Sequence, residues 1–207
     1  MSTTTEAPAR LHLQGVEMSV EEFLALPDDG IHRELIRGTV REFPGDDEVP
    51  LRSPCVTVRN RIHSRVVIRI GQSLANWMDT RPEPRGEVVG GEVGFRLKGT
   101  PESLVGIDVA VASAEQVAML GPEERIYNGP PLLAVEVLSP SDTHQDLVDT
   151  VTGYLEVGTV VWIVDPDLKM LTIYQPRCEP RMVTARDEIK DEPYLPGFQA
   201  SVARFFQ

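Results

Sequence analysis

Several stretches of this sequence have the composition of strands that lie inside a protein. The stretch "TVVWIVDP", residues 159–166, is almost wholly apolar, and such a strand is usually covered on both faces. Two patterns with helical periodicity, over residues 56–78 and 142–156, could supply that cover. The sequence therefore predicts an α/β or α+β fold in which helices flank a central sheet. The other expected strands are "VVGGEVGFRL" (88–97), "LVGIDVAVAS" (104–113), "LLAVEVLS" (132–139) and "MLTIYQP" (170–176).

Shorter patterns predict the remaining elements. In "MSVEEFLALPDDG", Ser19 and Glu22 have the spacing of a capping box, which predicts a short helix ended by Pro27. "HRELIRGTVREFP" predicts two strands that turn at Arg37 and Gly38. In "SPSD", Ser139 is the expected N-cap of the helix over 142–156. The tail "LPGFQASVARFF" predicts a short closing helix.

The length of 207 residues fits one domain, which we place at 17–207 after a loosely ordered or disordered stretch over 1–16. No apolar run has the length of a membrane span, and the first residues lack the pattern of a secretory signal. We therefore expect a cytoplasmic protein with no membrane partner. Cys55 and Cys178 stand alone and form no metal-ligand pattern, so we assign them no function.

The formal net charge of -12 argues against a protein that holds nucleic acid by overall electrostatics. The segment from Arg52 to Arg85 is an exception, because it contains seven arginines against two acidic residues. On the helix expected there, Arg61, Arg65 and Arg69 form one stripe, on a different face from the apolar residues. This stripe is a solvated face and the candidate contact for a DNA backbone.

Two acidic residues stand inside the expected strands. Side chains alternate across a strand, so Asp108 shares its face with Gly106, Ala110 and Ala112, while Glu136 lies beside Ala134. Burial of an ionised carboxylate without a partner costs several kcal/mol, so each acid needs a cation or hydrogen-bond donors. One interpretation is a salt bridge or backbone hydrogen bonds. The other is a divalent metal site, because two carboxylates in one cleft suit Mg²⁺ and a phosphate.

Taken in order along nearly the whole chain, seven stretches resemble the Uma-two family of restriction endonuclease-like proteins, within the PD-(D/E)xK nuclease superfamily. They are "MSVEEFLALPDDG", "ELIRGTV", "GEVGFRL", "IDVAVAS", "LAVEVLSPSDT", "YLEVGTVVWIVDP" and "LPGFQASVARFF". The resemblance implies a restriction-endonuclease-like core, with a mixed central sheet flanked by helices and a divalent metal, Mg²⁺ or Mn²⁺, held by the motif acids.

Carried over by position, the resemblance makes Asp108 and Glu136 the catalytic metal ligands. Glu34 matches an acidic residue that completes the catalytic set in the family, although it could instead pair with Arg33 or Arg37. His63 lies near the family's early histidine. It also falls on the apolar face of its helix. We therefore expect it either to contact a metal ligand without binding the metal itself or to be an ordinary core residue.

The chain departs from the family pattern at the lysine. Leu138 occupies the lysine position of the E-x-K motif, and Thr150 occupies the helix position to which the family moves it. Ile107 replaces the motif proline, which a strand tolerates. Lys98 could reach the site from a neighbouring strand. Loss of the lysine should reduce the rate of hydrolysis even where metal still binds.

Three functions remain open on the sequence. The first is a Mg²⁺-dependent endonuclease that hydrolyses phosphodiester bonds in DNA, as a homodimer where both strands are cut. The second is a nuclease-fold binding or assembly module that is weakened or inactive because the lysine is lost. The third is a phosphoesterase that acts on small molecules, which the net charge of -12 would suit.

Overall fold

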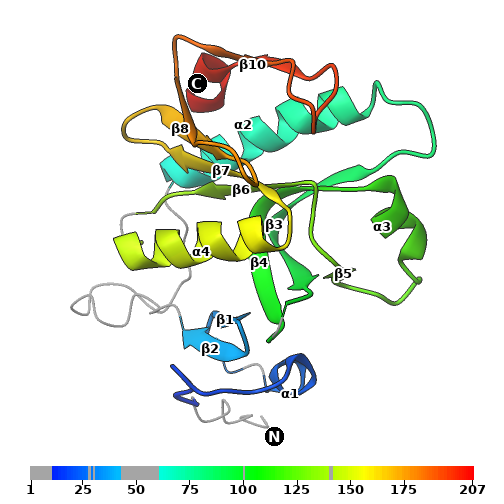
Figure 1. Cartoon of the computed structure of the whole chain (residues 1–207), viewed down its shortest axis with the longest axis vertical. Helices are drawn as coiled ribbons and strands as arrows, with labels where there is room; N and C mark the ends of the chain where they lie inside the picture. The colour runs from blue at the N-terminus through cyan, green and yellow to red at the C-terminus, as the bar shows by residue number, and fades with distance from the viewer. Residues whose placement is uncertain (1–10, 28, 30, 43–60, 100, 140–141) are drawn as a thin grey trace, which may run out of the picture.

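The computed structural model of the chain describes residues 11–27, 29, 31–42, 61–99, 101–139 and 142–207. Cys55, Pro140 and residues 56–60 of the expected long helix lie outside this part. The described strands form a nine-stranded mixed sheet (Figure 1). In chain order they are β1 (Arg33–Ile36), β2 (Thr39–Glu42), β3 (Glu87–Leu97), β4 (Ser103–Ala112), β5 (Tyr127–Asn128), β6 (Leu133–Val137), β7 (Val160–Asp165), β8 (Met170–Tyr174) and β9 (Arg181–Thr184).

The other elements lie around this sheet. A second, two-stranded sheet pairs β10 with β11. The bounds of these elements are α1 (Val20–Leu24), α2 (Arg61–Met78), α3 (Ala114–Met119), α4 (His144–Glu156), β10 (Glu188–Lys190), β11 (Gln199–Ser201) and the 3-10 helix η2 (Val202–Phe206). The mixed sheet flanked by helices confirms the fold class that the sequence predicts. None of the helices in the described ranges is long and apolar enough to cross a membrane.

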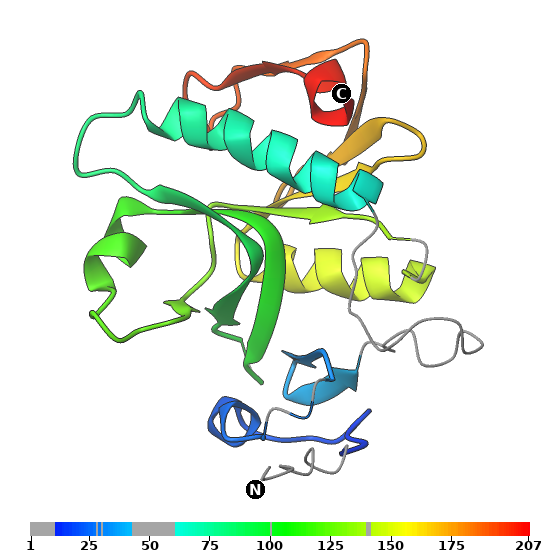
Figure 2. The ribbon, with the colours of Figure 1, turned by 180° about the vertical axis from the view of Figure 1, so that it is seen from behind.

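Helices α2 and α4 lie on opposite sides of β6 and β7 (Figures 1 and 2). On the α2 side, Ile70 and Leu74 pack in one cluster with Trp162 of β7 and Phe205 of η2. On the α4 side, Tyr154 packs with the opposite face of β7. All residues of β7 up to Val164 are buried, so the strand is covered on both faces, as its apolar composition predicts.

The two edges of β4 are used differently, and this positions the candidate site. One edge pairs with β3 along almost its whole length, from Glu87↔Ala112 to Leu97↔Ser103. The other edge pairs first with β1, at Leu104, and then with β6, over Val109–Val111. Between these two contacts, at residues 105–108, β1 and β6 separate from each other along the edge of β4.

The β1–β2 hairpin turns where the sequence predicts, at Arg37 and Gly38, which have φ of 49° and 73°. Such values are typical of a two-residue hairpin turn. A Cβ on Gly38 would lie 3.0 Å from the Cβ of Pro101, so glycine also allows a close approach of the chain. Residues 11–16 lie against this hairpin, since Gly15 donates its N–H to the carbonyl oxygen of Val40.

Two helix predictions are wrong in detail. Thr143, not Ser139, caps α4, because its side chain accepts from the N–H of Asp146 and completes a capping box. Asp142 instead accepts hydrogen bonds from both the backbone N–H and the hydroxyl of Ser139. The tail is β11 followed by η2, because residues 199–201 pair with β10 before the chain turns. The capping box of Ser19 and Glu22 in α1 is as predicted, but the helix ends at Leu24, before the predicted end at Pro27.

The α2 interface provides a stability test within one helix. Ile70 is fully buried, whereas Ile68 is 67% exposed. We expect Ile70→Ala to lower the free energy of unfolding by about 2–5 kcal/mol, because it removes buried methylene groups and leaves a cavity. Ile68→Ala should change it by no more than about 0.5 kcal/mol. Urea unfolding followed by circular dichroism measures both, and equal losses would contradict this packing.

Candidate functional site

The three acidic residues singled out in the sequence meet where β1 and β6 part along the edge of β4. Val109 faces Val135 in the antiparallel ladder of β4 and β6, so one step further along Asp108 faces Glu136. Directly opposed side chains in an antiparallel pair lie on the same face of the sheet. The charge of Asp108 acts on Glu136, so the two carboxylates from these neighbouring strands lie close together, with Asp108 contacting α2 through His63 and Glu136 contacting α4 through Tyr154.

The Asp108 carboxylate takes the place of a missing strand partner. Its Oδ2 accepts a hydrogen bond of 2.9 Å from the N–H of Val137, which would otherwise point into the gap between β4 and β6. The same oxygen lies 3.2 Å from Nε2 of His63, in the first turn of α2. His63 is buried, and its contact with Asp108 fixes the orientation of this carboxylate from the α2 side.

Glu136 is held from the other side of the sheet. Its Oε1 accepts a hydrogen bond of 2.7 Å from the hydroxyl of Tyr154, a buried residue of α4. Burial raises the pKa of Glu136 well above its ordinary value of 4.5, the negative charges of Asp108 and Glu34 raise it further, and the hydrogen bond from Tyr154 opposes the rise. Asp108, Glu136 and Glu34, which we call the acid pocket, therefore act on one another as like charges.

Glu34 of β1 is the third acidic residue of the site. Its Oε1 accepts a hydrogen bond of 3.0 Å from the N–H of Gly106, inside the same gap along β4. Its charge contributes to the raised pKa of both Glu136 and Tyr154. The two arginines that the sequence offered as alternative partners of Glu34 have other partners. Arg33 pairs with Asp29 and Glu42, and Arg37 pairs with Glu156.

The predicted arginine stripe lies away from these acids. With about 100° per residue, Arg61, Arg65 and Arg69 stand about 120–160° around α2 from His63. Arg69 donates through Nε to the backbone oxygen of the last residue, Gln207, at 3.2 Å. The stripe therefore forms a separate surface of α2, and a bound DNA would have to span both regions.

Sequence reasoning placed Tyr154 on the inner face of its helix but gave it no role at the site. A buried tyrosine hydroxyl usually has a hydrogen-bond partner, and this could have linked Tyr154 to the acid in the neighbouring strand.

The two positions where the family would place a lysine lie in different elements. Leu138 follows the end of β6, whereas Thr150 stands on α4 one turn before Tyr154. Lys98 is exposed beyond the end of β3.

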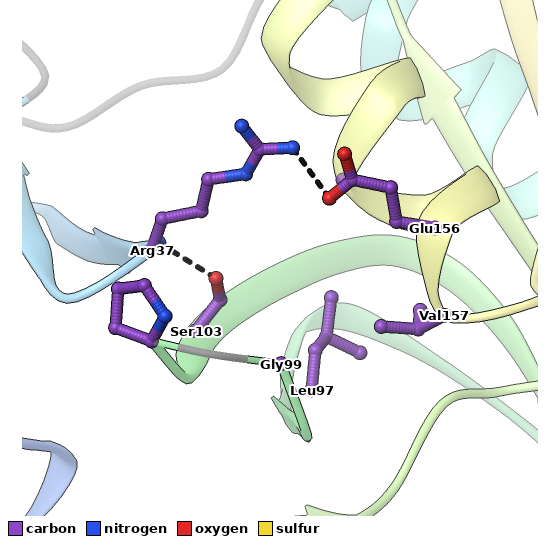
Figure 3. Close-up of a pocket in the computed structure, with 8 residues that line it drawn as sticks. Arg37, Leu97, Gly99, Ser103, Glu156 and Val157 are labelled. Atoms are coloured by element: carbon purple, nitrogen blue, oxygen red, sulfur yellow. Dashed lines mark hydrogen bonds and ion pairs between the residues drawn. The ribbon is translucent and has the colours of Figure 1, made fainter.

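A shallow cavity of about 360 Å³ lies beside the acid pocket, between the β1–β2 turn and the C-terminal end of α4. Figure 3 shows Arg37 reaching across it toward Glu156, while its backbone N–H donates to the Ser103 hydroxyl at 2.7 Å. The lining residues are Arg37, Leu97, Gly99, Pro101, Ser103, Gly153, Glu156 and Val157. These residues include none of the predicted catalytic acids, so we assign the chemistry to the acid pocket.

The acid pocket has the donors that a hard divalent cation prefers. Its candidate ligands are the carboxylate oxygens of Asp108 and Glu136, and oxygen ligands suit Mg²⁺ or Mn²⁺. In the part of the chain that the structure describes, no three His, Cys, Asp or Glu side chains form a ready-made metal site. Mg²⁺ is commonly held by one or two carboxylates and keeps several waters. The carboxylates of Asp108 and Glu136, whose charges act on each other, therefore fit such an ion.

Comparison with known proteins identifies the family and the fold. The model of the Uma2 family, described as "Putative restriction endonuclease", matches residues 20–203, so the chain belongs to this family. The crystal structure of a putative nuclease of the DUF820 group from Anabaena variabilis is similar, with a TM-score of 0.71 and 18% sequence identity over 91% of this chain and 97% of that chain. Identity this low shows a shared fold. Comparison with curated proteins finds no match. Family and fold together indicate a nuclease-like protein.

The raised pKa of Glu136 predicts a pH-dependent stability. Because this pKa is higher in the folded protein than in the unfolded chain, the stability from Glu136 is full below about 4.5 and is lost as the pH rises through the folded pKa. In metal-free buffer, Glu136→Gln should therefore melt at a higher temperature than the wild type at pH 8, and the difference should shrink toward pH 4. Thermal unfolding over this range is the measurement.

The matched control for this prediction is Glu123→Gln, since Glu123 is exposed in the loop after α3. Its melting temperature should follow the wild type at every pH. A Glu136→Gln variant that is less stable than the wild type at pH 8 would show that the carboxylate is compensated within the folded protein.

Proposed function

We propose that this protein is a metal-dependent nuclease that hydrolyses phosphodiester bonds in DNA, at the pocket formed by Asp108, Glu136 and Glu34. The observation that carries the proposal is the convergence of Asp108 and Glu136 from adjacent strands, with a Glu136 pKa raised by burial and by the other acids. Buried like charges are costly, and they persist where a function uses them. Membership of the Uma2 family supports the same class of reaction.

In this proposal Asp108 and Glu136 hold Mg²⁺ or Mn²⁺, with Glu34 close enough to act on the same ion or its waters. A bound divalent ion would lower the pKa of a water molecule and polarise the phosphate. The rest of the chain serves to orient the ligands. Val137 and His63 fix the Asp108 carboxylate, and Tyr154 fixes the Glu136 carboxylate through its hydroxyl hydrogen bond.

A binding or assembly module that keeps the fold without catalysis is the second candidate. Two observations favour it: the neutral residues Leu138 and Thr150 at the lysine positions, and the net charge of -12. The hydrogen bonds to Asp108 and Glu34 also satisfy backbone N–H groups where the strands part, which is a structural role for these two acids. Metal binding and DNA cleavage separate the two candidates.

We expect Asp108→Asn and Glu136→Gln each to abolish Mg²⁺ binding in calorimetric titration and Mg²⁺-dependent nicking of supercoiled plasmid. Each substitution preserves the shape of the side chain and removes the charge that the ion requires. Circular dichroism should show both variants folded. Glu123→Gln, which removes one exposed negative charge, controls for the change in overall charge and should bind and cut like the wild type.

The results of these measurements distinguish the two candidate functions. Metal binding without cleavage in the wild type would favour the binding module. Cleavage that persists in the Asp108→Asn, Glu136→Gln double variant would place the reaction elsewhere. A wild type that binds no Mg²⁺ or Mn²⁺ at millimolar concentration would leave the acids as structural groups that close the gap in the sheet.

A further inference from the structure

A cation stands beside the acid pocket although no lysine occupies the positions on β6 and α4. Arg41 lies on β2, directly opposite Glu34 of β1 in the antiparallel hairpin. Opposed residues in such a pair project from the same face, so Arg41 and Glu34 both point to the side that meets β4 and α4. Glu34 reaches the backbone N–H of Gly106, which places this face of the hairpin at the gap along β4.

The Arg41 guanidinium is anchored on α4. Its Nη2 pairs with Oδ1 of Asp146, and the two side chains are only 17% and 32% exposed. The other oxygen of Asp146 accepts a hydrogen bond of 2.9 Å from the N–H of Thr143, as part of the capping box. The carboxylate that holds Arg41 is therefore itself fixed by the first turn of the helix.

The anchor point and the acid pocket share one stripe of α4. Asp146, Thr150 and Tyr154 follow at intervals of four residues, which places them one above another on the helix surface. Tyr154 contacts Glu136 at one end of the stripe, and Asp146 contacts Arg41 at the other. Thr150 lies between them, about 6 Å along the helix axis from each.

We propose that Arg41 is the cationic group that contacts the phosphate of the substrate, held in place by Asp146 as a positioning residue. The inference rests on the proposed function for its place in catalysis. The ion pair with Asp146 holds the guanidinium at the first turn of α4. Its planar donors match two phosphate oxygens at once, and partial burial strengthens such a contact.

The same hairpin provides a matched control. Arg37 also pairs with an acid of α4, Glu156, but at the C-terminal end of the helix and beside the shallow cavity. Arg37→Gln and Arg41→Gln remove the same charge from the same hairpin, and each breaks one ion pair to α4. Their difference therefore measures position and not net charge.

The experiment compares wild type, Arg37→Gln, Arg41→Gln, Arg41→Lys and the double variant Arg41→Gln, Thr150→Lys. The first readout is the affinity for inorganic phosphate in the presence of Mg²⁺, by calorimetry, and the second is the rate of plasmid nicking. We expect Arg41→Gln to weaken phosphate binding about tenfold or more, as for the loss of a hydrogen bond to a charged group. Arg37→Gln should bind like the wild type.

Rescue distinguishes a phosphate contact from a purely structural ion pair. Arg41→Lys should retain part of the affinity, and Thr150→Lys in the Arg41→Gln background should recover part of it, because it returns a cation to the same stripe of α4. A structural role for the Arg41–Asp146 pair predicts no such recovery. If Arg41→Gln does not fold, Asp146→Asn tests the same anchor while its amide oxygen still accepts the capping hydrogen bond.

The two readouts separate this inference from the proposed function. Arg41-dependent phosphate binding without plasmid cleavage in the wild type would support the inference and reject the nuclease. Cleavage and phosphate binding that are equal in Arg41→Gln and Arg37→Gln would reject the inference and leave the nuclease standing. A wild type that neither binds phosphate nor cuts plasmid would reject both.

Discussion

The hydrogen bond from the N–H of Val137 to Asp108 is the contact on which the site depends. A continuous ladder between β4 and β6 would satisfy that N–H with a backbone oxygen and would leave no room for a pocket. Here the ladder ends at Val109 and Val135, and β1 takes over the same edge of β4 at Leu104. Carboxylates from Asp108 and Glu34 satisfy the N–H groups in between. The sheet can therefore open at this edge without leaving buried donors unpaired.

The same opening gathers negative charge. Each carboxylate that accepts from a backbone N–H adds charge to a confined space, and Glu136 shows the result in its raised pKa. Hydrogen bonds from Tyr154 and from backbone groups compensate this charge only in part. In the proposed function, a divalent cation would compensate the remaining charge. Structural and catalytic interpretations of these acids are compatible for this reason.

Helix α4 and the β1–β2 hairpin together form the entrance to this pocket. Arg37 joins the hairpin to Glu156 and Arg41 joins it to Asp146, at opposite ends of the helix. The acids lie beneath, since Glu34 belongs to the hairpin and Glu136 contacts Tyr154 of α4. The carboxylates of Glu34 and Glu136 therefore lie within the site, and Arg37 and Arg41 lie at its edge. In the proposed function, Arg41 would meet the substrate phosphate while Asp108 and Glu136 hold the metal.

The fold class and the acids follow from local patterns in the sequence: the almost wholly apolar stretch at 159–166 predicts a strand covered on both faces, and Asp108 and Glu136 interrupt strands that are otherwise apolar. The sequence could not determine which strand edges meet. That choice, made by long-range pairing, places Glu34 beside Gly106, 72 residues away. It also brings Arg41 to Asp146 of α4. Only the tertiary structure decided these contacts, because they join residues whose spacing along the chain carries no periodic signal.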